Sequence, residues 1–270
     1  MRRHIVEVCR RVYARGWITA TDGNVSALLG PERVLCTPTG INKGTMTEDD
    51  LIVIDRAGKK LAGTRAPSSE ILMHLAAYDA RPDVGGVVHA HPTNCIAFSL
   101  AGISLAQCLL PEIVFTFGSI PTTAYTTPTT QEVPDEVRKW LRDFDAMILD
   151  RHGSLTVGAD VFAAYDKLER MEHVAEITFR ARTLGPIRPL APAQVERLRA
   201  VGRGLGLPER KILDSPCDHC NACPSGRAGA APTVGPAVAA TAMSAEAPPV
   251  DVNAMIRRVT ETTELALRRR

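Results

Sequence analysis

Residues 84–92 read VGGVVHAHP, an apolar run that ends in two histidines at alternate positions and a proline. Because side chains alternate between the two faces of a β-strand, His89 and His91 point to the same side. Two imidazoles on one face can chelate a divalent metal, and a third ligand would leave a coordination position open for chemistry. The alternative is one buried, hydrogen-bonded histidine beside one that faces solvent. The stretch predicts a buried strand with a candidate metal site at its end.

The third ligand of such a site is predicted to be His152, in the sequence ILDRHG at residues 148–153. It follows an apolar run and precedes a glycine, where a strand end meets a turn. Taken alone, it could equally be an ordinary turn histidine. His74 and His173 lie in predicted helices, and we expect them to make core or interface hydrogen bonds instead.

Composition excludes several classes of protein. The chain has 270 residues, is 45% hydrophobic and carries a formal net charge of +2. That balance argues against nucleic acid as the main partner, which would need a concentrated positive surplus. A run of about 18 apolar residues, the length that spans a membrane, is lacking, and no apolar signal region follows the basic amino terminus. We therefore expect a cytoplasmic protein without a transmembrane segment.

Strand and helix patterns alternate along the first 210 residues, which predicts a mixed α/β layered domain over 1–210. Helices are predicted at 4–15, 67–79, 134–143, 160–183 and 192–204. Strands are predicted at 51–55, 84–88, 113–117, 120–124 and 146–150.

Composition changes after about residue 210. Residues 211–249 are predicted to hold a cysteine cluster and then a flexible linker of Ala, Pro, Gly, Ser and Thr, which cannot bury enough apolar surface to fold. Helical periodicity returns over 250–270, which predicts an amphipathic helix that needs a docking partner. The cluster contains Cys217, His219, Cys220 and Cys223. It could bind a second metal ion or an iron–sulfur cluster, or hold redox-active or unstructured thiols.

Six short motifs in order resemble the class II aldolase/adducin family, and within it the L-fuculose-1-phosphate aldolases. They are DGNVS at 22–26, TPTG at 37–40, PSSE at 67–70, RPDV at 81–84, VHAH at 88–91 and HG at 152–153. The resemblance runs over about residues 1–205. It implies a three-layer α/β/α fold with a central, mainly antiparallel sheet. It also implies a homotetramer with active sites at subunit interfaces.

The resemblance assigns roles to individual residues. It implies one Zn²⁺ per subunit on His89, His91 and His152, and a proton-carrying carboxylate at Glu70. The residues that match the family's substrate-phosphate pocket are Thr21, Gly23, Asn24, Thr39, Gly40, Ser68 and Ser69.

Local chemistry agrees with an anion site. Ser68 and Ser69 are expected at a helix amino terminus, where free N–H groups and the helix dipole favour an anion. Gly23 and Gly40 let the backbone approach a phosphate closely. The two serines could otherwise be simple helix caps.

The reaction implied is cleavage of a ketose 1-phosphate such as L-fuculose 1-phosphate. The products would be dihydroxyacetone phosphate and an aldehyde such as lactaldehyde. Zinc on three neutral imidazoles would act as a Lewis acid. Glu70 would return a proton to carbon, and we expect partial burial to raise its pKa toward neutrality.

One departure from the family pattern weakens the substrate assignment. Leu110 stands where these aldolases carry a tyrosine from the neighbouring subunit, and Tyr125 matches a different position. Two alternatives stay open: an L-ribulose-5-phosphate 4-epimerase and a non-enzymatic, adducin-like scaffold. The epimerase's extra aspartate is missing from 110–120, and a scaffold would be expected to lose metal ligands.

The linker and terminal helix resemble the encapsulation peptides of enzymes housed in bacterial microcompartments. This implies docking of 250–270 on a shell protein and a place in the microcompartment lumen. Membrane-surface binding and self-association are the alternatives.

Overall fold

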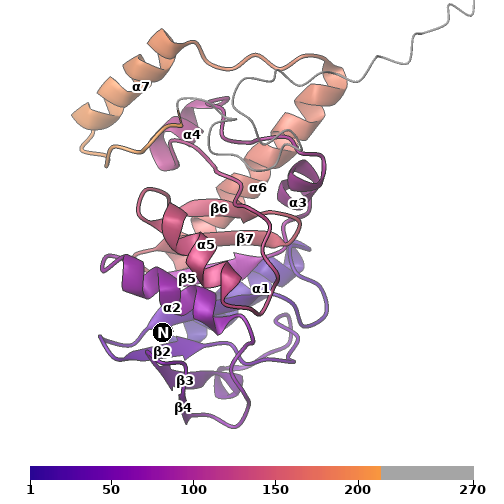
Figure 1. The fold of residues 1–270 in the computed structure, drawn as a ribbon, viewed down its shortest axis with the longest axis vertical. Coiled ribbons are helices and arrows are strands. Elements are labelled where there is room, and N and C mark those ends of the chain that lie inside the picture. Colours follow the sequence, from indigo (N-terminus) through magenta and orange to yellow (C-terminus); the bar gives the residue numbers. More distant parts are fainter. Residues whose placement is uncertain (214–270) are drawn as a thin grey trace, which may run out of the picture. The chain divides into compact units, whose positions relative to one another are not determined.

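A seven-stranded sheet forms the centre of the computed structural model (Figure 1), which describes residues 1–213. The strand order is β4-β3-β2-β1-β5-β7-β6, and every pairing between neighbours is antiparallel. The strands are β1 (Asn24–Leu28), β2 (Arg33–Cys36), β3 (Ile52–Asp55), β4 (Lys60–Ala62), β5 (Gly86–Ala90), β6 (Ala146–Leu149) and β7 (Gly153–Gly158). The expected central antiparallel sheet is confirmed.

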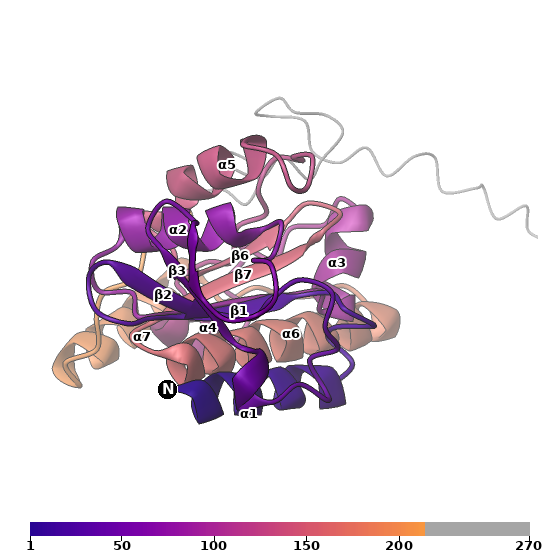
Figure 2. The same cartoon turned by 90° about the horizontal axis from the view of Figure 1, so that it is seen from below.

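Helices cover both faces of this sheet (Figure 2). On one face lie α2 (Ile71–Ala80) and α5 (Glu132–Leu141); on the other lie α1 (Arg2–Ala14) and α6 (Val161–Leu184). The remaining helices are η1 (Glu48–Asp50), α3 (Thr93–Leu100), α4 (Pro111–Thr116) and α7 (Pro192–Gly204). Each face has its own apolar core. The three-layer α/β/α arrangement is therefore confirmed.

β5 is buried along its whole length because it lies between β1 and β7 with helices on both sides. Its pairing places Asn24 opposite His89, and His89 opposite Leu155. The predicted run at 84–88 thus belongs to a central strand, and Pro92 falls just after that strand ends. This pairing brings the end of β5 beside the β6–β7 hairpin, which carries His152.

Two predicted strands are wrong. Residues 113–117 belong mostly to α4, because Pro111 occupies its first turn and Leu110 caps it. Proline favours the first position of a helix because its fixed φ is already helical. Here this preference outweighs the strand preference of the β-branched residues that follow. Residues 120–124 form no strand within residues 1–213; a single parallel bridge joins Thr122 to Ile148.

The last described residues are tied to the edge of the sheet next to β6. The Leu213 backbone N–H donates to Ser119 Oγ at 3.1 Å. Arg210 pairs with the buried Asp145 at 2.7 Å. At Gly118 a Cβ would lie 2.1 Å from the Lys211 carbonyl oxygen, so only glycine permits this close approach.

The predicted cysteine cluster, linker and terminal helix lie outside the described residues, apart from residues 211–213. Within residues 1–213, none of the helices has the length and apolar character needed to cross a membrane.

Candidate metal centre

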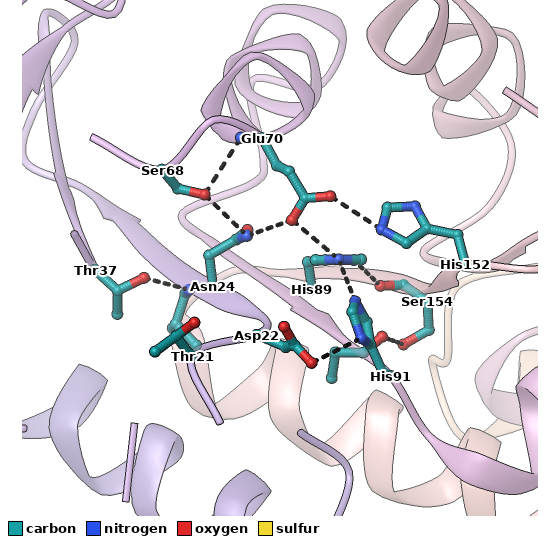
Figure 3. Close-up of polar contacts among 12 residues, drawn as sticks. Thr21, Asp22, Asn24, Thr37, Ser68, Glu70, His89, His91, His152 and Ser154 are labelled. Carbon is teal, nitrogen blue, oxygen red and sulfur yellow. Dashed lines mark hydrogen bonds and ion pairs between the residues drawn. The ribbon is translucent and has the colours of Figure 1, made fainter. Parts of the chain in front are cut away.

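Three histidines converge where β5 ends beside the β6–β7 hairpin (Figure 3). One ring nitrogen each from His89, His91 and His152 lies within 4.8 Å of the others. His89 is in β5, His91 follows it, and His152 is in the turn before β7. The structure therefore brings together all three histidines that the sequence predicted as ligands.

The chemistry of these imidazoles fits a divalent cation. His89 Nδ1 lies 2.8 Å from the Ser154 carbonyl oxygen, an acceptor, so Nδ1 carries the proton and Nε2 offers a lone pair. His91 Nε2 faces His89 Nε2 at 3.1 Å. Burial, with the charges of His89 and His152, lowers the pKa of His91 to about 4. His91 is then neutral near pH 7, as a metal ligand must be.

A carboxylate stands across from these nitrogens. Glu70 Oε1 lies 3.0 Å from His152 Nε2, and Oε2 lies 3.4 Å from His89 Nε2. Glu70 is the residue that caps α2, so the start of that helix fixes its position. An acid at this distance can exchange a proton with a molecule held at the three nitrogens.

The expectation of a raised pKa at Glu70 is wrong. Burial raises the pKa of the carboxyl, but hydrogen bonds from His152 and His89 outweigh burial and hold it well below its ordinary value. Both contacts need a proton on an imidazole nitrogen, which a metal-binding nitrogen does not carry.

Two predicted phosphate residues join the same network. Asn24 Nδ2 donates to Glu70 Oε2 at 3.0 Å and to Ser68 Oγ at 3.3 Å (Figure 3). The Thr39 N–H donates to the Ala66 carbonyl at 3.0 Å, which holds the 37–40 turn beside the 66–70 segment. Thr39 and Gly40 are exposed at the edge of this region.

Gly23 shapes the turn that leads into β1. Its φ is +67°, and a Cβ there would lie 2.5 Å from Ile18 Cγ2 and 3.0 Å from the His89 carbonyl oxygen. Thr21, just before it, is exposed, and its carbonyl accepts a hydrogen bond of 2.5 Å from Lys43 Nζ. This geometry requires glycine at position 23, while the predicted phosphate binding stays a prediction.

The helix predicted from residue 67 begins later, at Ile71. Ser68 and Ser69 therefore precede α2 instead of forming its first turn. The Ser68 carbonyl accepts the Ile71 N–H at 3.2 Å, and Ser68 Oγ accepts the Glu70 N–H at 3.3 Å. Ser69 is exposed and lines a small hollow together with Thr129.

Three further residues support the centre and were missed in the sequence. The Ser154 carbonyl accepts from His89, Asp22 Oδ2 lies 3.8 Å from His91 Nδ1, and Lys43 holds the turn before β1. Asp22 stands in the DGNVS motif, so its carboxylate was the one visible signal. A backbone acceptor such as that of Ser154 leaves no mark in a sequence.

Other predictions for single residues have mixed outcomes. His74 is buried and bonded to Ser26, which confirms its predicted core role. Leu110, at the position of the expected tyrosine, caps α4, and Tyr125 is 59% exposed. The cluster at 217–223 lies outside the described residues, so its metal, iron–sulfur and redox interpretations stay predictions.

Comparison with known proteins identifies a family that the sequence of this chain matches. Residues 3–179 match the family described as "Class II Aldolase and Adducin N-terminal domain". An L-fuculose phosphate aldolase of Methanococcus maripaludis is 32% identical over 174 residues, covering 64% of this chain and 93% of the relative. A 3-oxo-tetronate 4-phosphate decarboxylase of Escherichia coli K12 is 30% identical over 206 residues, covering 74% and 95%.

A solved structure is similar as well. A crystal structure of YgbL of Escherichia coli, described as a putative aldolase/epimerase/decarboxylase, shares 30% sequence identity. It covers 73% of this chain and 97% of its own, with a TM-score of 0.68.

Proposed function

The chain belongs to the class II aldolase and adducin family, and we propose that it is a zinc-dependent sugar-phosphate aldolase. Its substrate is a ketose 1-phosphate, such as L-fuculose 1-phosphate. Its products are dihydroxyacetone phosphate and an aldehyde, such as lactaldehyde. The observation that carries this proposal is the convergence of three imidazole nitrogens with the Glu70 carboxylate.

His89, His91 and His152 would hold the metal, which when bound supplies a Lewis acid for negative charge on the substrate oxygens. Cleavage between C3 and C4 turns the C4 hydroxyl into the aldehyde carbonyl, which frees one proton, and leaves carbanion character at C3, which takes one proton up. Glu70 lies on the same side as the three imidazole nitrogens, and we expect its carboxylate to accept the C4 hydroxyl proton and return a proton to C3. The Asn24 amide keeps the carboxylate turned toward the site.

The phosphate group of the substrate binds at the turns that precede β1 and α2. Asn24 and Ser68 lie within hydrogen-bonding distance of each other, and Thr21, Gly23, Thr39, Gly40 and Ser69 complete the predicted pocket. Hydroxyl, amide and backbone N–H groups can bind a phosphate without a net positive charge. Fixing the phosphate orients the C3–C4 bond relative to Glu70, and orientation is a large part of such catalysis.

The test is product analysis with purified full-length protein loaded with Zn²⁺. Dihydroxyacetone phosphate formed from L-fuculose 1-phosphate, and lost on chelation, would support the proposal. The reverse reaction with a panel of aldehydes would identify the aldehyde. An epimer without free aldehyde would support the epimerase. Absence of both metal uptake and turnover would support a scaffold.

A decarboxylase is the second candidate, because relatives of that name match at 30% identity over 206 residues. Loss of CO₂ from a 3-oxo acid phosphate leaves the same kind of carbanion, and Glu70 would protonate it. Release of CO₂ from 3-oxo-tetronate 4-phosphate, with no cleavage of ketose 1-phosphates, would favour this candidate over the aldolase.

Assembly and location are proposed from the sequence. We propose a homotetramer, to be measured by light scattering of the full chain. Residues 250–270 are proposed to dock the enzyme on a shell protein inside a bacterial microcompartment. A fusion of 248–270 to a fluorescent protein should form foci in cells with assembled shells. A diffuse signal would contradict this.

A further inference from the structure

Two buried polar atoms near Glu70 have no hydrogen-bond partner within residues 1–213. They are Asn24 Oδ1 and His74 Nε2. The two residues are only 4% and 0% exposed. An unsatisfied buried polar group is costly, so a pair of them close to the Glu70 carboxylate calls for a physical reason.

The two atoms belong to neighbouring side chains. Asn24 and Ser26 lie on one face of β1, two residues and so about 6.6 Å apart. Glu70 caps α2, and His74 lies four residues further on, in the first turns of that helix. Asn24 bonds Glu70 at 3.0 Å, and Ser26 bonds His74 at 2.7 Å. From these two parallel contacts we infer that the Asn24 amide and the His74 imidazole are neighbours between the strand and the helix.

A short chain of hydrogen bonds decides which nitrogen of His74 carries the proton. Ser26 Oγ lies 2.7 Å from Tyr78 Oη and 2.7 Å from His74 Nδ1. Tyr78 is buried, and if Ser26 donated to it, the phenol proton would lack an acceptor. With Tyr78 as the donor to Ser26, the single hydroxyl proton of Ser26 is left for His74 Nδ1, and we infer this direction for both bonds. Burial lowers the pKa of His74 to about 3, so the ring is neutral and its one N–H is at Nε2.

The orientation of the Asn24 amide matters to Glu70. Nδ2 donates to the Glu70 carboxylate and to Ser68 Oγ. A half-turn of the amide would bring Oδ1 next to the carboxylate, and two hydrogen-bond acceptors repel each other. A group that binds Asn24 Oδ1 therefore also keeps Glu70 in place.

We propose that His74 is the positioning residue for Glu70. Its Nε2–H holds Asn24 Oδ1 through one bridging water, which keeps the Asn24 Nδ2 turned toward the Glu70 carboxylate. Tyr78 and Ser26 serve this arrangement by setting the tautomer of His74. The proposal rests on the proposed function only in the role that it gives Glu70.

The first test needs no activity. NMR of the full-length protein labelled with ¹⁵N-histidine should show His74 as the neutral Nε2–H tautomer near pH 7. A high-resolution crystal structure should show an ordered water within hydrogen-bonding distance of His74 Nε2 and Asn24 Oδ1. A neutral Nδ1–H tautomer, or an Asn24 Oδ1 bonded to another group, would overturn the proposal even in an active enzyme.

The second test compares two substitutions. H74N keeps a polar atom toward Ser26 but loses the group at Nε2, whereas H74Q places an amide N–H near the Nε2 position. We expect kcat to fall about tenfold in H74N and to stay within about threefold of wild type in H74Q. Zinc content should be equal in both, since His74 is not a ligand.

The control for lost stability is T178V, which removes a buried hydroxyl on α6 that donates to the Val174 carbonyl. Equal kcat in H74N and T178V, or equal losses in H74N and H74Q, would show a merely structural role. If the chain cleaves no sugar phosphate at all, the NMR and crystallographic outcomes still decide the role of His74.

Discussion

Under the proposed function, the chemistry depends on Glu70, whose carboxylate lies within 3.4 Å of two of the candidate ligand histidines. E70Q keeps the size of the side chain but cannot exchange a proton. We expect kcat for cleavage to fall by about 10²- to 10⁴-fold. Zinc content, measured by metal analysis, should not change, because the ligands are histidines. Near-normal turnover in E70Q would remove Glu70 as the proton carrier, and the exposed Glu32, as E32Q, serves as the control.

Asp22 is the acidic side chain that faces the imidazole of His91. Its Oδ2 lies 3.8 Å from His91 Nδ1 and accepts from Thr19 Oγ1 at 3.1 Å. A carboxylate behind a ligand histidine orients the ring and makes it a better donor. We expect D22N to weaken Zn²⁺ binding by about tenfold, measured by competition with a chromophoric chelator. The exposed Asp49 in η1 gives the control D49N, and equal affinity in the two variants would contradict this role.

At the scale of elements, glycines set how closely β5 packs against α6. A Cβ at Gly86 would lie 2.3–2.5 Å from backbone atoms of Asp160 and Val161. G86A should therefore destabilise the fold by about 1–3 kcal/mol, measured by urea unfolding. The control is G204A in α7, where a Cβ meets nothing within 4 Å. G204A should be neutral or slightly stabilising, and an equal loss in both variants would refute the packing argument.

Elements with strong apolar periodicity were predicted well, and those governed by single turn residues were not. The helix at 4–15 and the run at 84–88 are confirmed as α1 and β5 within a few residues. The segment 113–117 was misassigned, because its β-branched and aromatic residues favour a strand while Pro111 starts a helix.

β7 went unpredicted because two glycines frame it. A Cβ at Gly158 would lie 2.6 Å from the Ala164 backbone nitrogen, so contact with α6 requires the residue that lowers strand propensity. The convergence of the three histidines was predictable, since two of them stand at strand spacing and the third follows an apolar run before a glycine. Their outer contacts were not, because the Ser154 acceptor is backbone and the His74–Ser26 pair depends on a register unknown before folding.

At the scale of the whole molecule, one buried carboxylate joins distant parts of the chain. Asp145 is 5% exposed and pairs with Arg81, Lys167 and Arg210 at 3.0, 2.8 and 2.7 Å. Burial raises the pKa of Asp145, but the three cations outweigh burial and lower it below the ordinary 3.8. The charged form is therefore favoured by folding.

The lowered pKa of Asp145 makes the stability of the fold depend on pH. Because its folded-state pKa lies below the unfolded value, the stabilisation is present above about pH 4 and is lost as pH falls through the folded-state pKa. D145N should cost about 2–3 kcal/mol at pH 7, because it removes the buried carboxylate that three half-buried cations share. Urea unfolding should show that the difference in free energy of unfolding between wild type and D145N becomes smaller below pH 4. A difference that does not change with pH would contradict the ion-pair explanation.

The anchoring of the last described residues has a consequence for protein engineering. Leu213 is bonded to Ser119, and Arg210 to Asp145, so these contacts hold the last described residues against the rest of the domain. A foreign sequence joined after Leu213 would leave every one of these contacts intact, whereas a cut before Arg210 would strip a cation from the core. A surface tether joined after residue 213 is therefore expected to leave the three-histidine site unchanged.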